Sequence, residues 1–493
     1  MTVMTLSLLW KKASPAVRFL SSAAFLVLLL LATIQPAQGL PAFARKYGLR
    51  CSACHESWPM LNYFGQKFKD NGYQIMNDRD APIWQNPSYW PVTFRITPIW
   101  HRVSTGKVPV DTYAGGAVSG STIQRITSSG FDLSGLDFHT GGTLEKNFSF
   151  YVLPSSNNLS QFHFETVMAR LDNLLGSPWL NIKFGKFELD NLLSEKRILT
   201  LTGNGGVYQL YHFAPVGDGN IFGQIGANQL GAELMGHSYN DRTRYSISLL
   251  SSAAGNVALP YGNAYTGFIA ASQAFDAGKM GVDRIGFYAM VGQAPTTWLT
   301  TGGGTQLFGG ANGTGPSAGG NKSFSREGFV GQFYFGQHVD LQVVTQHGQD
   351  NVWFGQNYGD LIDGKAGNNN VSGTTLPVGS RAPTWNGVLF EPHYVYSPQL
   401  IFIGRFETIR MSQQANGPGY TGVGPTGIVG PSPSNLGNIT TYTIGYRYNP
   451  FMTSRAGFAW HNEYNWLHSD GTGPTPGSNI NTSELLLGFD FDF

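Results

Sequence analysis

Charged side chains are scarce in this sequence of 493 residues: Asp, Glu, Lys and Arg together make up 12% of it, about half of the usual quarter. The formal net charge is only +1, so the chain lacks the basic excess that holds a phosphate backbone, and we expect no nucleic-acid partner. Low charge with a mean hydropathy of −0.14 argues against a helical membrane protein. Glycine is abundant at 64 residues, and the aromatic content of 13% argues against disorder. Together these values predict a β-rich protein whose strands each present one face to lipid.

Long apolar runs are missing except near the N-terminus. Basic residues precede an apolar run over residues 19–34, and the small residues Ala37 and Gly39 stand at the two positions that a signal peptidase reads. The run is shorter than the span of about 20 residues that a transmembrane helix needs. We therefore predict a cleaved secretory signal over residues 1–39, with an uncleaved anchor as the alternative. Because no comparable run follows, any membrane-embedded part of the mature chain must be a barrel.

Cysteine is limited to two residues, and both fall in the motif Cys51-Ser52-Ala53-Cys54-His55. C-x-x-C-H is the attachment motif of c-type haem, in which two thiols reach the vinyl groups of one porphyrin and the adjacent histidine lies under the iron. A thioredoxin-like pair needs a βαβ context, a zinc site needs four ligands, and a simple disulfide does not need His55. We therefore predict one covalent haem c held by Cys51, Cys54 and His55.

A short helix is expected directly after the motif. Leu61, Phe64 and Phe68 recur at i, i+3 and i+7 on one face, and Gly72 provides a stop signal. Three apolar residues are too few to bury a haem. The expected cytochrome segment, residues 40–85, therefore needs apolar cover from the rest of the protein.

The sequence does not decide the sixth ligand of the iron, because three residues lie within reach along the chain: Met60, Met76 and His101. A methionine would raise the reduction potential relative to a second histidine. Met76 is favoured, since the chain between it and His55 is long enough to return across the ring. An exchangeable water or an open position is the remaining alternative.

From about residue 86 the sequence alternates with period two. In the last segment, 485–493, every second residue is Leu or Phe, and the residues between them are Leu, Gly or Asp; similar alternation recurs at 180–185, 245–249 and 441–448. A lipid-facing row beside a lumen-facing row is typical of outer-membrane strands. The terminal Phe493 resembles the recognition end of bacterial outer-membrane barrels.

The connections between these segments alternate in length. Long stretches rich in Gly, Pro and Asn over 470–481, 412–437, 349–384 and 300–321 alternate with tight turns at Tyr448-Asn449-Pro450, Tyr396-Ser397-Pro398 and Gly336-Gln337-His338. Long extracellular loops and short periplasmic turns are the rule for these barrels. The alternation places Phe493 on the periplasmic side and predicts an even number of strands, about 16, over residues 86–493.

One further pattern surrounds the haem motif. Phe43-Ala44-Arg45 precedes C-x-x-C-H, and Pro59, Leu61, Phe64, Gly65, Phe68, Gly72 and Tyr73 follow it. This layout resembles the fused cytochrome–porin family, outer-membrane monohaem c-type cytochromes of iron-oxidising bacteria. The motif similarity covers about 30 residues, and the rest matches by size and barrel pattern only. The resemblance implies that Phe64, Gly65 and Phe68 pack against the porphyrin. It also implies that Fe(II) is oxidised outside the cell and electrons pass inward.

These observations predict an all-β transmembrane barrel in the outer membrane, with a small N-terminal helical c-type cytochrome inside it as a plug. Electrons would pass from an extracellular Fe(II) donor to a periplasmic cytochrome c, making the protein an electron carrier and at most an Fe(II):cytochrome c oxidoreductase. The positive charges of the cytochrome segment would suit an acidic patch on that carrier. The main rival is a solute porin with a structural or sensory haem, and a soluble periplasmic β protein is a third alternative.

Overall fold

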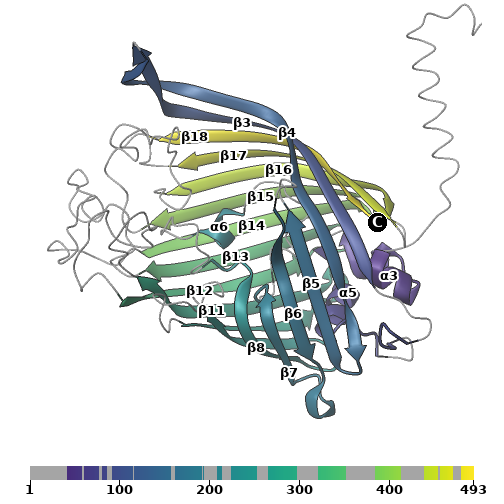
Figure 1. Ribbon diagram of the computed structural model, residues 1–493. Helices are drawn as coiled ribbons and strands as arrows, with labels where there is room; N and C mark the ends of the chain where they lie inside the picture. The colour runs from purple at the N-terminus through teal and green to yellow at the C-terminus, as the bar shows by residue number, and fades with distance from the viewer. Residues whose placement is uncertain are drawn as a thin grey trace, which may run out of the picture.

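Sixteen strands close into one antiparallel barrel, in which each strand pairs with its neighbours in sequence and β18 closes on β3 (Figure 1). The computed structural model describes residues 41–57, 60–76, 80–85, 91–114, 116–156, 161–190, 193, 208–213, 224–251, 265–296, 320–350, 384–411, 438–452, 456–469 and 479–493. The predicted signal segment lies outside these residues. The predicted strand number is confirmed.

The barrel strands run as follows. They are β3 (Val92–Ala114), β4 (Ala117–Glu145), β5 (Phe148–Ser156), β6 (His163–Leu171), β7 (Asn181–Phe187), β8 (Gln229–His237), β9 (Thr243–Ser251), β10 (Tyr265–Asp276), β11 (Val282–Thr296), β12 (Gly320–Tyr334), β13 (Val339–Asp350), β14 (Thr384–Ser397), β15 (Leu400–Met411), β16 (Ile439–Met452), β17 (Gly457–Ser469) and β18 (Ile480–Asp492). Short 3-10 turns, η1 (Leu174–Gly176) and η3 (Gly278–Met280), follow β6 and β10.

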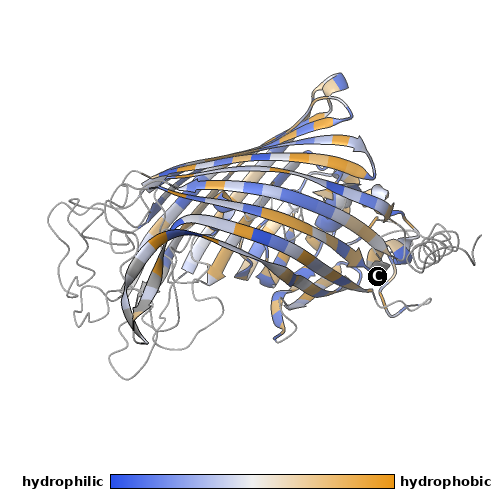
Figure 2. Ribbon diagram, turned by 90° about the horizontal axis from the view of Figure 1, so that it is seen from above, coloured by the Kyte–Doolittle hydropathy of each residue, from blue (hydrophilic) through white to orange (hydrophobic). Residues whose placement is uncertain are grey.

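The two faces of the wall differ in polarity, as the alternation predicts. On β18, Leu487 and Phe489 are 39% and 38% exposed on the outside, whereas Asp490 and Asp492 are buried inside. Figure 2 shows hydrophobic and hydrophilic residues alternating along the strands. Backbone groups in lipid must be paired within the protein, which a closed barrel achieves. The apolar exterior and polar interior therefore make this a transmembrane barrel of the outer-membrane type.

Among the described residues, no helix is long and apolar enough to cross a membrane.

The two ends of the barrel carry connections of different length. At the turn end, the connections 146–147, 335–338 and 398–399 are short, and Phe493 lies beside them; at the loop end, the connections 297–319, 351–383 and 412–437 are long. The predicted turn at Tyr448-Asn449-Pro450 is wrong, because β16 continues through these residues to Met452. A register shift between Tyr448 and Phe451 accommodates Pro450, as expected for a residue that has no N–H to donate.

The C-terminal residue completes the closure of the barrel. The N–H of Phe493 donates to the carbonyl of Phe94 at 3.0 Å, and the N–H of Phe94 donates back at 2.9 Å. The two rings stack with centroids 5.5 Å apart, and Phe138 meets Phe94 at 4.8 Å. Aromatic rings thus gather on the outside of the turn end, as they do at the membrane interface of outer-membrane barrels.

The N-terminal segment, described over residues 41–57, 60–76 and 80–85, lies inside the barrel at the turn end, and we call it the plug. It contains α3 (Pro41–Tyr47), α4 (Cys51–Cys54), β1 (His55–Ser57), β2 (Met60–Leu61) and α5 (Tyr63–Asp70). Its side chains contact strands on different sides of the barrel: Lys46 bonds to Thr143 of β4, Glu56 to Tyr334 of β12, and Asp70 to Arg244 of β9. A segment that reaches all three strands must cross the lumen. Figure 1 shows α3 and α5 near the C-terminus.

Candidate functional site

The motif Cys51-Ser52-Ala53-Cys54 forms one helical turn, α4. The N–H of His55 bonds to the carbonyl of Cys51 and ends the turn, and residues three apart on a helix share one face. Cys51 and His55 are buried, being 3% and 6% exposed. Cys51 and Cys54 form no disulfide with each other, so the disulfide alternative is not what this structure shows.

Helix α5 is pressed against α4 through a glycine and an asparagine. The side chain of Asn62 accepts a hydrogen bond from the N–H of Gly65 at 2.9 Å and donates to the carbonyl of Ala53 at 3.1 Å. Its own N–H bonds to the carbonyl of Cys54 at 2.9 Å. A Cβ atom at Gly65 would lie 2.0 Å from that carbonyl oxygen. Only glycine therefore fits where α5 crosses the attachment turn.

Aromatic side chains supply apolar cover beside the attachment turn. Phe68 of α5 packs against Phe43 and Tyr47 of α3, with ring centroids 5.4 and 5.3 Å apart. Tyr73 stacks on Phe43 at 4.8 Å and meets Tyr151 of the wall at 5.9 Å. These rings therefore pack the parts of the plug together and against the wall; their contact with a haem stays a prediction.

The predicted helix differs from the observed one at its start. Asn62 caps α5, which begins at Tyr63, and Leu61 belongs to β2 instead. The expectation that Leu61 belongs to this helix is therefore wrong. Phe68 is buried and Phe64 is 41% exposed, whereas packing of Phe64 against a porphyrin stays a prediction. The predicted stop at Gly72 is confirmed, with φ at 72°.

The sixth-ligand candidates lie in three different settings. Met76, the favoured one, is 59% exposed. Met60 is fully buried in β2, where it pairs with Ser57 of β1. His101 faces Glu484 on the wall at 3.7 Å and is partly exposed. The identity of the sixth ligand stays a prediction.

The chemistry of the donor set fits a covalent haem c. Burial, the nearby Asp492 carboxylate and Cys54 raise the pKa of the Cys51 thiol to about 12, and burial raises the pKa of Cys54 to about 11. Such thiols are poor metal ligands, since it is the thiolate that binds metals. A thioether carries no ionisable proton, so attachment to a porphyrin is compatible with this burial. In the described part of the chain, no three His, Cys, Asp or Glu side chains group to hold a bare metal ion.

Glu56 joins the histidine side of the motif to the wall. Its carboxylate accepts a hydrogen bond from the hydroxyl of Tyr334 at 3.0 Å. Burial and the nearby Asp340 carboxylate raise the pKa of Glu56 to about 7. The residue after His55 is therefore fixed to β12.

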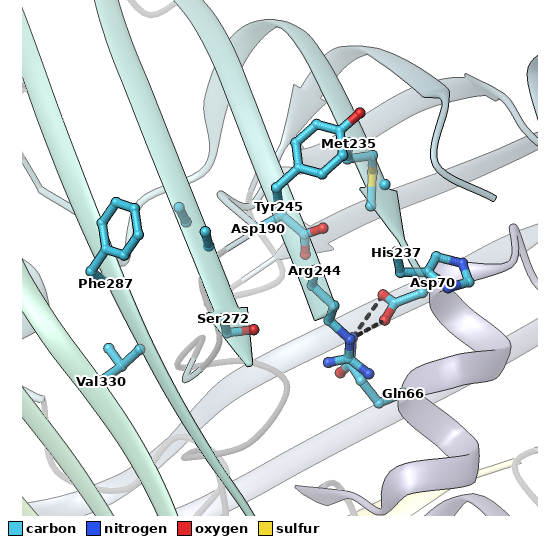
Figure 3. A pocket seen from close by; sticks show the side chains of 13 residues that line it. Gln66, Asp70, Asp190, Met235, His237, Arg244, Tyr245, Ser272, Phe287 and Val330 are labelled. Carbon is cyan, nitrogen blue, oxygen red and sulfur yellow. Dashed lines mark hydrogen bonds and ion pairs between the residues drawn. The ribbon is translucent and has the colours of Figure 1, made fainter. Parts of the chain in front are cut away.

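The far end of α5 is held by two arginines of the wall. Arg170 of β6 donates to the carbonyls of Lys69 and Asp70, both at 2.8 Å. Arg244 of β9 reaches the Asp70 carboxylate at 3.1 Å, as Figure 3 shows. Gln66 and Asp70 line a small pocket of about 30 Å³ between α5 and strands β8 to β12. We call these contacts of Arg170 and Arg244 the latch.

Some of the cations expected to meet a carrier protein are used inside the molecule. Arg45 donates to the carbonyl of Val92 at 2.7 Å, and Lys46 donates to the carbonyl of Ala81 at 2.7 Å. Desolvation lowers the pKa of Lys46. Arg45 thus ties the plug to β3, and Lys46, which also donates to Thr143 at 3.2 Å, ties it to β4.

A second segment enters the lumen nearer its middle. Helix α6 (Gln209–His212) packs against β14 and β15. The Glu407 carboxylate accepts the N–H groups of Gln209 and Leu210, each at 3.1 Å. The guanidinium of Arg405 lies 3.5 Å from the centre of the Tyr208 ring. The plug and α6 therefore occupy the lumen at two places.

The sequence analysis missed the wall residues that hold these two segments, namely Arg170, Arg244, Arg405 and Glu407. Each stands at an inward position of its strand. The sequence does contain a signal for them. In an alternating segment the apolar positions identify the lipid-facing row, and a charged residue at one of the positions between them faces the lumen.

Comparisons with known proteins add the following. No protein-family model matches the chain, and no curated protein matches it. Among solved structures it is similar to an anion-selective porin from Comamonas acidovorans, at 11% identity over 82% of this chain and all of that one, with a TM-score of 0.48. It is also similar to the channel DcaP of Acinetobacter baumannii, at 9% identity over 82% of this chain and 97% of that one, with a TM-score of 0.46. These similarities concern the barrel and carry no argument about function.

Proposed function

We propose that this protein carries electrons across the outer membrane, from an extracellular Fe(II) donor through one haem c to a periplasmic cytochrome c. The observation that carries the proposal is that the C-x-x-C-H turn, with Cys51 and His55 buried, belongs to a segment bonded to the inner wall at Thr143, Tyr334 and Arg244 instead of hanging free. Cys51 and Cys54 would hold the haem, and His55 would ligate its iron. Bound there, haem c supplies reversible one-electron chemistry.

The arrangement of the lumen supports electron transfer over solute passage. The plug crosses the turn end, and α6 lies further along the lumen. Both occupy space that a general porin would leave to its solutes. Because the attachment turn lies at the turn end, a soluble periplasmic acceptor has a short path to it. An extracellular donor must instead approach through the lumen from the loop end.

The test uses the purified full-length protein from an expression host that attaches haem. We expect covalent haem on a denaturing gel, a reduced α-band after addition of Fe(II), and small conductance in a planar bilayer. The double variant Cys51→Ser/Cys54→Ser is the control and should retain the barrel but carry no haem. A haem that stays oxidised in Fe(II), in a protein with a large open conductance, would instead identify a solute porin with a structural or sensory haem.

A further inference from the structure

The exposed side of α5 continues into a neighbouring turn of the wall. Tyr63, the first residue of α5, is 50% exposed, and its hydroxyl donates to the carbonyl of Asn240 in the β8–β9 connection. Nζ of Lys67, one helical turn further on, donates to the carbonyl of Tyr239 at 3.5 Å. Tyr239 is itself 71% exposed. Plug and wall therefore form one continuous surface here, at the turn end of the barrel.

This surface adjoins the attachment turn. Asn62, the residue before Tyr63, donates its N–H to the carbonyl of Cys54 at 2.9 Å, and its side chain donates to the carbonyl of Ala53 at 3.1 Å. Arg50, which precedes the C-x-x-C-H motif, is exposed. A partner that binds this surface would therefore contact residues bonded directly to the attachment turn, without entering the barrel.

The exposed charges of this surface are positive because its carboxylates are used inside the molecule. Asp70 of α5 and Asp241 of the β8–β9 connection are both buried, and both pair with Arg244; Figure 3 shows the pair with Asp70. Arg242, beside Asp241, stays exposed, and Lys67 is half-buried at the edge. Each element thus buries its anion and leaves a cation towards solvent.

The other carboxylates of the plug do not cancel this charge. Glu56 bonds to Tyr334 of the wall, and Asp80 accepts two hydrogen bonds within the plug. Among the described plug residues, no Asp or Glu side chain is exposed. The next connection of the wall, between β10 and β11, adds exposed Lys279, which Asp276 at the end of β10 balances. The surface therefore keeps a net positive charge.

We propose that Arg50, Tyr63, Lys67, Tyr239 and Arg242 form a docking face for a soluble electron carrier that presents an acidic patch. Tyrosine and arginine are enriched in protein interfaces, and complementary charge speeds and orients an encounter more than it adds affinity. A small contact of this kind is typical of electron-transfer partners, which must separate after each reaction.

The inference rests on the proposed function, because it assigns the place where the periplasmic acceptor meets this protein. Each encounter transfers one electron, which oxidises this protein and reduces the carrier, so no further reactant is needed.

The test uses reduced, haem-loaded protein in nanodiscs of zwitterionic lipid and two soluble cytochromes c of similar potential, one acidic and one basic. At low salt we expect the acidic cytochrome to be reduced about tenfold faster or more, and high salt should remove this advantage, because ions screen the attraction. Lys67→Glu and Arg242→Glu should each slow reduction of the acidic cytochrome several-fold at low salt. Its binding to the same nanodiscs should weaken in parallel.

Lys146→Glu is the matched control. Lys146 is an exposed cation of the same end of the barrel, but it lies in the β4–β5 connection. Its replacement should leave the rate and the binding of the acidic cytochrome unchanged. A small neutral oxidant should react equally with the wild type and all three variants, which shows that the haem itself is unaltered.

Three outcomes overturn the docking face. They are equal rates with the two cytochromes, rates that do not depend on salt, and equal effects of Lys67→Glu and Lys146→Glu. Binding to anionic lipid vesicles that requires Lys67 and Arg242, without a preference for the acidic cytochrome, would identify a site for lipid headgroups and overturns it as well.

Failure of the proposed function is distinguishable from these outcomes. A wild type without covalent haem overturns that function, and binding of the acidic cytochrome then decides the docking face by itself. If Lys67→Glu loses heat-modifiable migration, and so its barrel, Lys67→Gln decides, because it removes the charge with little change in length. A weaker salt dependence in that variant supports the docking face, and an unchanged one overturns it.

Discussion

Gly65 is the single residue that fixes the distance between α5 and the attachment turn. In Gly65→Ala the new Cβ would start 2.0 Å from the carbonyl oxygen of Cys54, and a backbone atom cannot move away as a side chain would. Overpacking of this kind costs about 1–3 kcal/mol. We expect faster hydrogen exchange of amides 51–70 while the barrel stays heat-modifiable. Gly457→Ala, which meets open space, is the control; equal exchange in the two variants would contradict the close approach.

The two thiols give a second prediction at this scale, for protein produced without haem. Because their pKa values are raised to about 12 and 11 from an ordinary value of 9.0, little thiolate exists at pH 8. Alkylation by iodoacetamide should therefore be about 100-fold or more slower than in the unfolded chain. Asp492→Asn should speed the reaction at Cys51, since it removes a charge that disfavours the thiolate. Asp276→Asn, on an exposed part of β10, is the control and should not change the alkylation rate of Cys51. Equal rates in the two variants would show that Cys51 does not lie near β18.

Among single residues, the sequence predicts those that belong to the C-x-x-C-H motif and misses the wall residues that face the lumen. Cys51, Cys54 and His55 lie together because they are neighbours along the chain. Arg170 and Arg244 reach the plug only because barrel closure brings strands far apart in sequence around one segment. Leu61 was misplaced because the cap at Asn62, and not hydrophobic periodicity, sets where α5 begins.

At the level of elements, the latch decides whether α5 stays docked. Breaking a buried ion pair costs about 3–5 kcal/mol, so Asp70→Asn and Arg244→Gln should each loosen α5. In a double-mutant cycle, read by hydrogen exchange of the α5 amides, we expect a coupling of about 0.5–3 kcal/mol. The pair is direct, with Nε and Oδ2 3.1 Å apart.

The control for this cycle is an arginine of the wall that does not touch the plug. Arg125 is exposed on β4 and bonds to Ser104, so the coupling of Arg125→Gln with Asp70→Asn should be near zero. Fully additive effects of Asp70→Asn and Arg244→Gln would show that the latch does not act through this ion pair.

Strand positions were predictable because the lipid imposes a strict two-residue period, and a slip by one residue would turn Asp490 and Asp492 outward. The ends of the strands were harder to predict. Asn449-Pro450 reads as a turn from its residue types, yet the N–H of Asn449 bonds to the carbonyl of Gln399, and the bulge beside Pro450 lets β16 continue. Cross-strand pairing, which a single segment does not reveal, overrides local turn preference here.

For the whole molecule, closure depends on the pairing of the first and last strands, and Phe493 contributes to it in two ways. Its backbone exchanges two hydrogen bonds with Phe94, and its ring stacks on the outside of the turn end. Phe493→Ala keeps the backbone pair and loses the ring contact, which is worth about 0.5–1.5 kcal/mol. We therefore expect nearly normal folding of this variant into lipid vesicles, measured by heat-modifiable migration, with slightly lower stability.

In cells the same variant should assemble poorly if the terminal ring is also a recognition signal, so the fraction of folded protein in the outer membrane should fall several-fold. Phe335→Ala removes another exposed aromatic residue of the turn end and should assemble normally. Equal assembly of the two variants in cells would mean that the ring serves closure alone. If Phe493→Ala also fails to fold into vesicles, then stacking of the Phe493 ring on Phe94, and not recognition, is what completes the barrel.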